Sequence, residues 1–475
     1  MKKVLLIIID ALASRALIPA LEANRLPTFQ ALAARGTLRT ECTAIFPSVT
    51  PAATSSIITG QYPSQHGILG FHWYDTERNK VLYFGNDFWV IWNKGLAQFF
   101  EEFLANLNNK QLQTNTLFQT VEQAGLKAAS LNYLIFQGDV EHKLDLPLIF
   151  NLISKAPTSQ KVYGPSILYL GDLVDTEIEL IGQALNGRGG VLHRFGFDDG
   201  NTADLLIQLA EKRALPELTV AYFPDNDFRS HEVGPLKASS VLENLDARLG
   251  EMIAAFGGLD SFLEETCVLI TGDHSQSDVR GDETAGIRLD KILANFSLSD
   301  TGAAWKETDQ LLICPALRVA QIYFREPGAL YFKQVVKQIL DDPRVDQAIW
   351  RANLQGDSNG YWVATRDRGQ LHFWPAPEQQ DGYDGQYGNR WAWRGELAAV
   401  DGSVRGNQVT STTYPNAFER IRGGLDAKSS GHLWVTAKPG YELQTAETSI
   451  HLGGGSHGSL HALDSISPLL VAGAP

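Results

Sequence analysis

The stretch KVLLIIID (Lys3–Asp10) places six consecutive aliphatic residues between a lysine and an aspartate. A continuous apolar run of this length is typical of a central strand in a parallel sheet, because other elements cover both faces of such a strand. Two later runs, LTVAYF (Leu218–Phe223) and CVLITG (Cys267–Gly272), also lead directly into acidic residues. The three runs therefore predict strands whose carboxyl ends carry carboxylates.

The segment between the last two runs has a helical pattern. In SVLENLDARLGEMIAAF (Ser240–Phe256) the apolar residues recur at helical spacing, which predicts a strand-helix-strand unit and a doubly wound α/β fold. Ligands of such sheets bind at the carboxyl ends of the strands. Asp10, Asp227 and Asp273 all fall at these ends.

The composition of the sequence changes after about residue 343. Residues 344–422 are rich in Gly, Trp and Tyr, with turn signals every several residues, and predict a small β-rich insertion or cap. The expected division is thus a catalytic α/β core over 1–343, the insertion over 344–422, and a return to the core over 423–475.

Composition excludes some classes of protein. The chain has 475 residues, 44% of them hydrophobic, and a net charge of −14 without a long run of either sign, which argues against a nucleic-acid polymer as partner. Cys42, Cys267 and Cys314 are odd in number and far apart, so we expect buried free thiols and a reducing, cytoplasmic location. The first apolar run is too short for a signal peptide or a membrane span, and we expect no membrane partner.

The stretch FPSVTPAATSSIITG (Phe46–Gly60) predicts a helix with Thr50 as N-cap, Pro51 as first residue and Gly60 as stop. Two interpretations of Thr50 follow. The residue is a simple helix cap, or it is a nucleophile at a helix N-terminus, where the partial positive charge can hold an anion.

Three further clusters are rich in Asp and His: PDNDFRSHEVGP (Pro224–Pro235), TGDHSQ (Thr271–Gln276) and GSHGS (Gly455–Ser459). Asp and neutral His are common ligands of zinc and similar divalent ions. Asp227 and His231 share one side of a helical turn, and Asp273 and His274 follow a strand. Each pair alone also fits a capped turn or a surface position.

Taken together, these motifs and Val4–Asp10 resemble the type I phosphodiesterase/nucleotide pyrophosphatase family of the alkaline phosphatase superfamily. The resemblance implies a three-layer α/β sandwich with a mostly parallel central sheet, and Thr50 as the nucleophile. It also implies two divalent ions, zinc by preference and manganese or iron as alternatives. Their implied ligands are Asp227, His231 and His457 for one ion, and Asp10, Asp273, His274 and the Thr50 oxygen for the other.

The implied function is hydrolysis of small phosphate esters, of the phosphodiester or pyrophosphate type, through a covalent phosphothreonine on Thr50. A phosphonate hydrolase or phosphomonoesterase with the same metal site is an alternative, and a non-catalytic ligand-binding member is another. A sulfatase is excluded, because that branch needs a Cys/Ser-x-Pro-x-Arg frame where this chain has Thr50-Pro-Ala-Ala-Thr.

Two positions stay open. The family's proline before the first aspartate ligand favours Asp225, whereas Asp-x-x-x-His spacing favours Asp227, and we choose Asp227 because it keeps the frame through His231 intact. The diesterase branch carries asparagines where this chain has Ala53 and Phe71. Phe71 is therefore expected either to form an apolar wall against substrate or to belong to the core.

Overall fold

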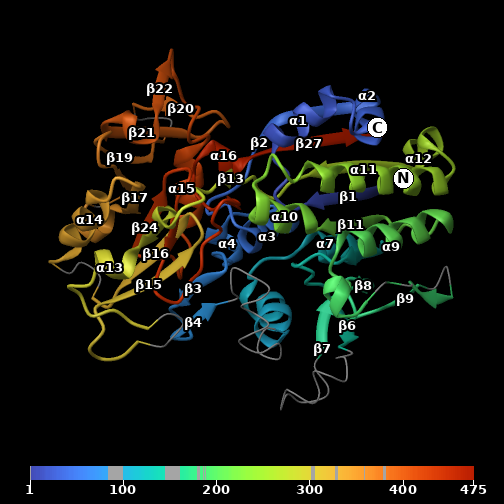
Figure 1. The fold of residues 1–475 in the computed structure, drawn as a ribbon, viewed down its shortest axis with the longest axis horizontal. Helices are drawn as coiled ribbons and strands as arrows, with labels where there is room; N and C mark the ends of the chain where they lie inside the picture. The colour runs from blue at the N-terminus through green and yellow to red at the C-terminus, as the bar shows by residue number, and fades with distance from the viewer. Residues whose placement is uncertain are drawn as a thin grey trace.

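The aliphatic run that opens the chain forms strand β1 (Lys3–Ile9) in the middle of a seven-stranded sheet (Figure 1). This computed structural model describes residues 2–83, 100–144, 161–178, 182–185, 187, 189–300, 305–326, 330–357, 359–377 and 381–474. The strand order is β2-β27-β12-β1-β11-β5-β8. The other strands are β2 (Gly36–Thr43), β5 (Ala128–Leu131), β8 (Ile167–Tyr169), β11 (Leu218–Phe223), β12 (Thr266–Thr271) and β27 (Ile466–Ala472).

The three strands predicted from apolar runs are confirmed as neighbours. β1 pairs in parallel with β11 on one side and with β12 on the other, and β5 and β8 continue the parallel order beyond β11. β27 is antiparallel to both β12 and β2. The sheet is therefore mostly parallel, as expected.

Both faces of β1 are buried, which explains its continuous apolar sequence. Leu6 and Ile8 belong to one hydrophobic cluster, whereas Leu5, Ile7 and Ile9 belong to another on the opposite face. The second cluster takes in α1 (Ser14–Glu22), α2 (Pro27–Ala34), α9 (Asp199–Glu211), α11 (Ser239–Phe256) and α12 (Leu259–Glu265). The helix predicted over Ser240–Phe256 is thus confirmed as α11.

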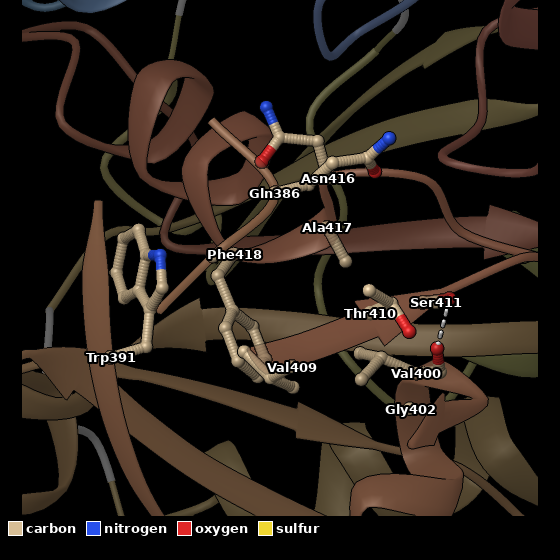
Figure 2. A pocket seen from close by; sticks show the side chains of 11 residues that line it. Gln386, Trp391, Val400, Gly402, Val409, Thr410, Ser411, Asn416, Ala417 and Phe418 are labelled. Atoms are coloured by element: carbon tan, nitrogen blue, oxygen red, sulfur yellow. Dashed lines mark hydrogen bonds between the residues drawn. The ribbon is translucent and has the colours of Figure 1, made fainter. Parts of the chain in front are cut away.

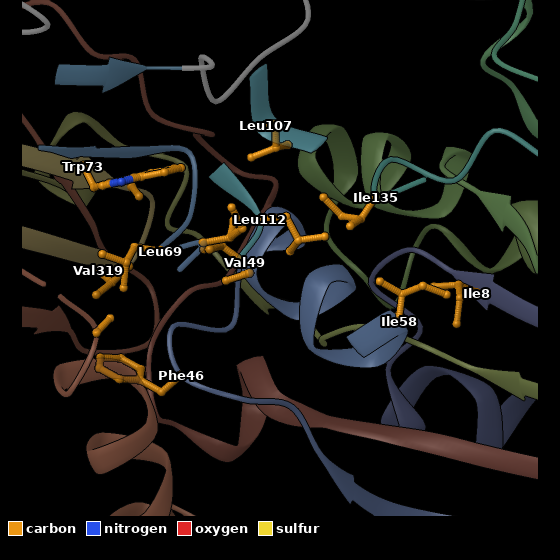
Figure 3. Packing of buried hydrophobic residues seen from close by; sticks show 14 of the residues in the cluster. Ile8, Phe46, Val49, Ile58, Leu69, Trp73, Leu107, Leu112, Ile135 and Val319 are labelled. Atoms are coloured by element: carbon orange, nitrogen blue, oxygen red, sulfur yellow. The ribbon is translucent and has the colours of Figure 1, made fainter. Parts of the chain in front are cut away.

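The first cluster is the core shown in Figure 3. It packs Ile8 of the central sheet with Val49 and Ile58 at the two ends of one helix, and with Val319 of a second sheet. Helices α3 (Thr50–Thr59), α7 (Leu117–Gln123) and α15 (Ala417–Leu425) contribute side chains to this cluster, and the short helix α4 (Pro63–His66) contacts α3 and α15. This core joins the two sheets.

The second sheet has ten strands, in the order β15-β16-β24-β17-β18-β19-β21-β20-β23-β22. Their bounds are β15 (Leu311–Ala316), β16 (Val319–Phe324), β17 (Val345–Arg351), β18 (Tyr361–Ala364), β19 (Gln370–Pro375), β20 (Tyr383–Asp384), β21 (Arg390–Gly395), β22 (Gly402–Arg405), β23 (Gln408–Ser411) and β24 (Leu433–Ala437). Its pairings are antiparallel apart from the short β20–β23 contact. The sheet takes strands from both sides of residues 343 and 422, and the division into domains stays a prediction.

The three cysteines are free, as expected. Only Cys314 is buried, whereas Cys42 and Cys267 are half-buried, so the expectation of full burial was wrong for those two. Cys42 lies on strand β2, whose one neighbour among the described strands is β27. Among the described residues, no helix combines the length and apolar character that crossing a membrane requires.

A fully buried ion pair ties the two sheets together. Arg318, between β15 and β16, donates to the carboxylate of Asp464 in α16 (Ala462–Ser465), and both side chains are 0% exposed. The same carboxylate accepts the backbone N–H of Ser459 at 3.0 Å, while the Arg318 N–H donates to the His457 carbonyl at 2.9 Å. The pair therefore fixes the loop that carries His457.

We expect Asp464→Asn to lower the free energy of unfolding by about 3–5 kcal/mol, because the Arg318 guanidinium would stay buried without its counter-charge. Asp341→Asn is the matched control, since Asp341 forms a 2.6 Å pair with Lys337 while 62% exposed. Its cost should stay below about 1 kcal/mol. Urea unfolding of both variants measures the difference, and equal losses would contradict the role of the buried pair.

Candidate metal centre

The predicted acidic residues meet at the carboxyl edge of the central sheet. Ile9 is in register with Phe223, and Ile8 with Thr271, so the ends of β1, β11 and β12 lie side by side. Asp10 follows β1 directly, Asp273 follows β12, and Asp227 lies in helix α10 (Asp225–Val233), which begins after β11. The parallel register therefore brings three segments that are distant in the sequence together at one site.

Two overlapping groups of metal-binding side chains form there. Asp10, Asp273 and His274 make one group, and Asp227, His274 and His457 make the other. Within each group the donor atoms all lie within 4.8 Å of one another, and all five residues are buried. His274 belongs to both groups, so the two halves of the centre are contiguous.

His231 borders the second group, as its spacing from Asp227 predicts. Its Nε2 is 3.3 Å from Asp227 Oδ2, and its ring centroid is 5.3 Å from that of His457. The Nδ1 atom of His231 donates to the Gly455 carbonyl at 2.8 Å, and that of His457 to the Ser48 carbonyl at 2.8 Å. Each backbone bond leaves Nε2 as the ring atom that can bind an ion.

Thr50 is the first residue of α3 rather than its cap. Val49 occupies the cap position, and within the described part of the chain no side chain caps the helix. The Thr50 hydroxyl instead lies 3.1 Å from His274 Nε2. The prediction of an N-cap was therefore wrong by one residue, and the simple-cap interpretation fails. Gly60 ends the helix as predicted, at φ 67°, where glycine avoids a steric cost.

Asp225 and Asp227 point to different partners. Asp225 accepts from Arg194 Nη1 at 2.5 Å and from the Asp199 backbone N–H at 3.2 Å. Asp227 instead faces His231 and His457. The arrangement favours Asp227 as the ligand, although the proline precedes Asp225, two positions earlier in the chain.

The charges of the centre fit divalent cations. In the described part of the chain, the ion pairs of Asp10, Asp227 and Asp273 are with histidines only. Burial, then the neighbouring Asp273 and Asp227, raise the pKa of Asp10 well above its usual value. Asp10 Oδ1 and Asp273 Oδ2 are buried without a hydrogen-bond partner among the residues that the structure describes. Orphaned carboxylate oxygens beside imidazoles are the donor set that zinc or a similar ion would satisfy.

Sequence reasoning missed the polar groups that hold these ligands. The Tyr222 hydroxyl donates to Asp10 Oδ2, the Asn226 amide donates to the Asp10 carbonyl at 2.8 Å, and the Gln276 amide donates to Asp227 Oδ1. Asn226 and Gln276 lie inside the Asp/His clusters of the sequence, and this position could have identified them as partners of the ligands. Tyr222 lies inside an apolar run, where nothing marks it.

Phe71 and Ala53 lie on the α3 side of the molecule. Ala53 is buried in the first turn of α3, and Phe71 is half-buried and packs against the core of Figure 3. The role of Phe71 toward substrate stays a prediction. The pocket in Figure 2 is separate from the centre, because residues of 385–418 line it, Trp391 and Phe418 among them, and none of the predicted site residues does.

The mostly parallel sheet, the buried Asp/His centre and the threonine at a helix N-terminus define an α/β protein of the alkaline phosphatase superfamily. The chain belongs to the type I phosphodiesterase/nucleotide pyrophosphatase family, whose profile matches residues 4–460. No curated protein sequence matches it.

Two solved structures show the same fold. The inactive threonine-to-alanine form of murine ectonucleotide pyrophosphatase/phosphodiesterase 5, in complex with AMP, is 13% identical with a TM-score of 0.57, over 99% of this chain and 88% of that one. Phosphonoacetate hydrolase from Sinorhizobium meliloti, in complex with phosphonoformate, is 15% identical with a TM-score of 0.57, over 99% and 90%.

The variant Asp273→Asn should distinguish a metal ligand from a residue that the fold needs. The Asn Oδ1 can still accept the Ala11 and His274 N–H groups, which lie 3.1 and 2.9 Å from Asp273 Oδ1, while its NH₂ replaces the orphaned Oδ2. Without metal, we expect the free energy of unfolding to rise by about 1–3 kcal/mol. Urea unfolding in chelator measures this gain, and a large loss would contradict it.

The same variant should lose part of its stabilisation by zinc, because the group of Asp227, His274 and His457 stays intact. Wild-type protein should gain about 2.7 kcal/mol for each bound ion when free zinc is one hundred times Kd, because only the folded state offers the centre. Repeating the unfolding with zinc tests this, and equal stabilisation of both proteins would show that zinc binds elsewhere.

The choice between the two aspartates is tested by metal content. We expect Asp227→Asn to lose one of two zinc equivalents in dialysed protein, since the second group would lose its only carboxylate. Asp225→Asn should keep both. Elemental analysis measures the content, and the reverse result would identify Asp225 as the ligand.

Proposed function

We propose that the chain is a metal-dependent hydrolase of small phosphate esters that acts on phosphodiester or pyrophosphate bonds through Thr50. One observation carries the proposal: the Thr50 hydroxyl caps nothing and faces His274, the residue that both ligand groups share. A hydroxyl fixed at this point of a buried centre is placed for nucleophilic attack.

The reaction is a double displacement at phosphorus. Thr50 Oγ1 attacks the phosphorus and its proton passes to solvent, while the bond to the leaving oxygen breaks and the leaving group takes up a proton from solvent and departs as an alcohol or phosphate. Water then attacks the phosphothreonine, the bond between phosphorus and Oγ1 breaks, and the threonine hydroxyl is restored. The N-terminus of α3 favours the negative phosphoryl oxygens throughout.

Asp227, His231 and His457 would hold one divalent ion, and Asp10, Asp273, His274 and Thr50 the other. Zinc suits this donor set, and manganese or iron would fit it too. When bound, two such ions favour the alkoxide form of a nearby hydroxyl and stabilise charge on the attacking and leaving oxygens. Tyr222, Asn226 and Gln276 would keep the carboxylates oriented.

Comparison with other proteins supports a small anionic substrate. One similar structure holds AMP and another holds phosphonoformate, so a phosphonate hydrolase is the second candidate, with a phosphomonoesterase beside it. The diesterase branch carries asparagines at the positions of Ala53 and Phe71. Because both residues are apolar here, the phosphonate hydrolase and the phosphomonoesterase are kept as alternatives. A purely ligand-binding role is less well supported, because such a protein has no need of a threonine hydroxyl facing the centre.

The proposal predicts that Thr50→Ala lowers kcat of the zinc- or manganese-loaded protein by about 10⁴-fold or more, because the nucleophile is lost. Thr50→Ser should retain part of the activity, since the hydroxyl remains. Initial rates with an aryl phosphodiester, an aryl phosphomonoester and an aryl phosphonate measure the effect and rank the three substrate classes.

Thr59→Ala is the control, because the Thr59 hydroxyl lies at the other end of α3 and donates to the Ser55 carbonyl at 2.6 Å. It should leave the rates nearly unchanged. If Thr50→Ala turned over each substrate as fast as wild type, Thr50 would not be the nucleophile.

A further inference from the structure

A fourth imidazole extends the row of histidines at the centre. The ring centroids of His274 and His457 are 3.7 Å apart, those of His457 and His231 5.3 Å, and those of His231 and His451 4.2 Å. The His274 side chain is 0% exposed and that of His451 is 15% exposed. The row thus runs from the buried nucleophile side toward solvent, and His451 is its outer member.

Glu442 holds His451 in one orientation. Glu442 begins strand β25 (Glu442–Gln444), which pairs in parallel with β14 (Gly286–Arg288), and the residue is 1% exposed. One carboxylate oxygen accepts the His451 backbone N–H at 2.7 Å, and the other accepts Nδ1–H at 3.0 Å. A carboxylate at Nδ1 fixes the tautomer, so the opposite ring atom, Nε2, is left to accept a hydrogen bond.

The two ligand groups do not use His451. Its Nε2 belongs to neither set of converging donor atoms. Some buried side-chain atoms in the described part of the chain lack a hydrogen-bond partner, and Nε2 of His451 is not one of them. A side chain fixed by a buried carboxylate, next to the centre and open to solvent on its far side, is placed to meet an incoming molecule rather than an ion.

The direction of the proposed reaction indicates which part of the incoming molecule lies near His451. In an in-line displacement the leaving group departs opposite the attacking oxygen. The attacking Thr50 Oγ1 is 3.1 Å from His274, at the inner end of the row. The leaving group would accordingly point toward the outer half, where His231 and His451 lie.

We propose that His451, oriented by Glu442, contacts the leaving group of the substrate and accepts a hydrogen bond from it through Nε2. This inference rests on the proposed function. It assigns a substrate class: esters whose leaving group carries a hydroxyl or amino donor close to the scissile oxygen, such as a polyol or an amino alcohol.

The test compares bis(2-hydroxyethyl) phosphate with dipropyl phosphate, which are similar in size and charge but differ in the hydroxyl. Zinc-loaded Thr50→Ala protein should bind the hydroxyethyl diester up to about tenfold more tightly by calorimetry, the range of one net hydrogen bond. Adding His451→Phe should abolish this preference without changing zinc content. Adding His451→Gln should restore part of it, because the amide oxygen can accept.

His142→Gln is the matched control, because His142, on strand β6 (Val140–Lys143), donates to the Pro165 carbonyl and belongs to neither ligand group. It should keep the preference. A preference that survives His451→Phe, or zinc lost from a folded His451→Phe protein, would overturn the inference. The proposed function fails separately, if zinc-loaded wild type hydrolyses no phosphate or phosphonate ester.

Discussion

The site depends on keeping three carboxylates buried together at one edge of the central sheet. Asp10, Asp227 and Asp273 converge there, and in the described part of the chain their ion pairs are with histidines only. Buried like charges repel strongly, so such a cluster is either protonated or balanced by cations. The pKa of Asp10 is raised first by burial and then by this repulsion from Asp273 and Asp227.

The surrounding fold also supplies hydrogen-bond donors to these carboxylates. The Tyr222 hydroxyl and the Gln276 amide each donate to one of the carboxylates, and the Ala11 N–H donates to Asp273 Oδ1 at 3.1 Å. Ala11 reaches this position with φ 56°, in the left-handed region that costs a non-glycine residue about 1–3 kcal/mol. Backbone strain directly after Asp10 is thus linked to the orientation of the Asp273 carboxylate, which follows the neighbouring strand β12.

The sequence predicted the elements whose pattern is local. The three apolar runs gave β1, β11 and β12 because strands buried on both faces must be continuously apolar, and the spacing of Asp227 and His231 gave their shared side of α10. Thr50 was misplaced by one residue because a cap and a first helical residue differ only in backbone angles. Tyr222 was missed because strand register, not composition, decides which side chains reach Asp10. Glu442 and His451 carry no motif, since only folding brings their pair to His231.

The two halves of the centre come from different parts of the architecture. The central sheet supplies Asp10 and Asp273 directly from strand ends. The loop of His457 is fixed by Arg318, whose N–H donates to the His457 carbonyl at 2.9 Å from the hairpin that begins the second sheet. His451 is likewise fixed through Glu442, whose strand pairs with β14 rather than with the central sheet. Substitutions in these outer segments would therefore change the side chains opposite the nucleophile without moving Thr50. In this way a fold can keep one reaction while its substrate changes.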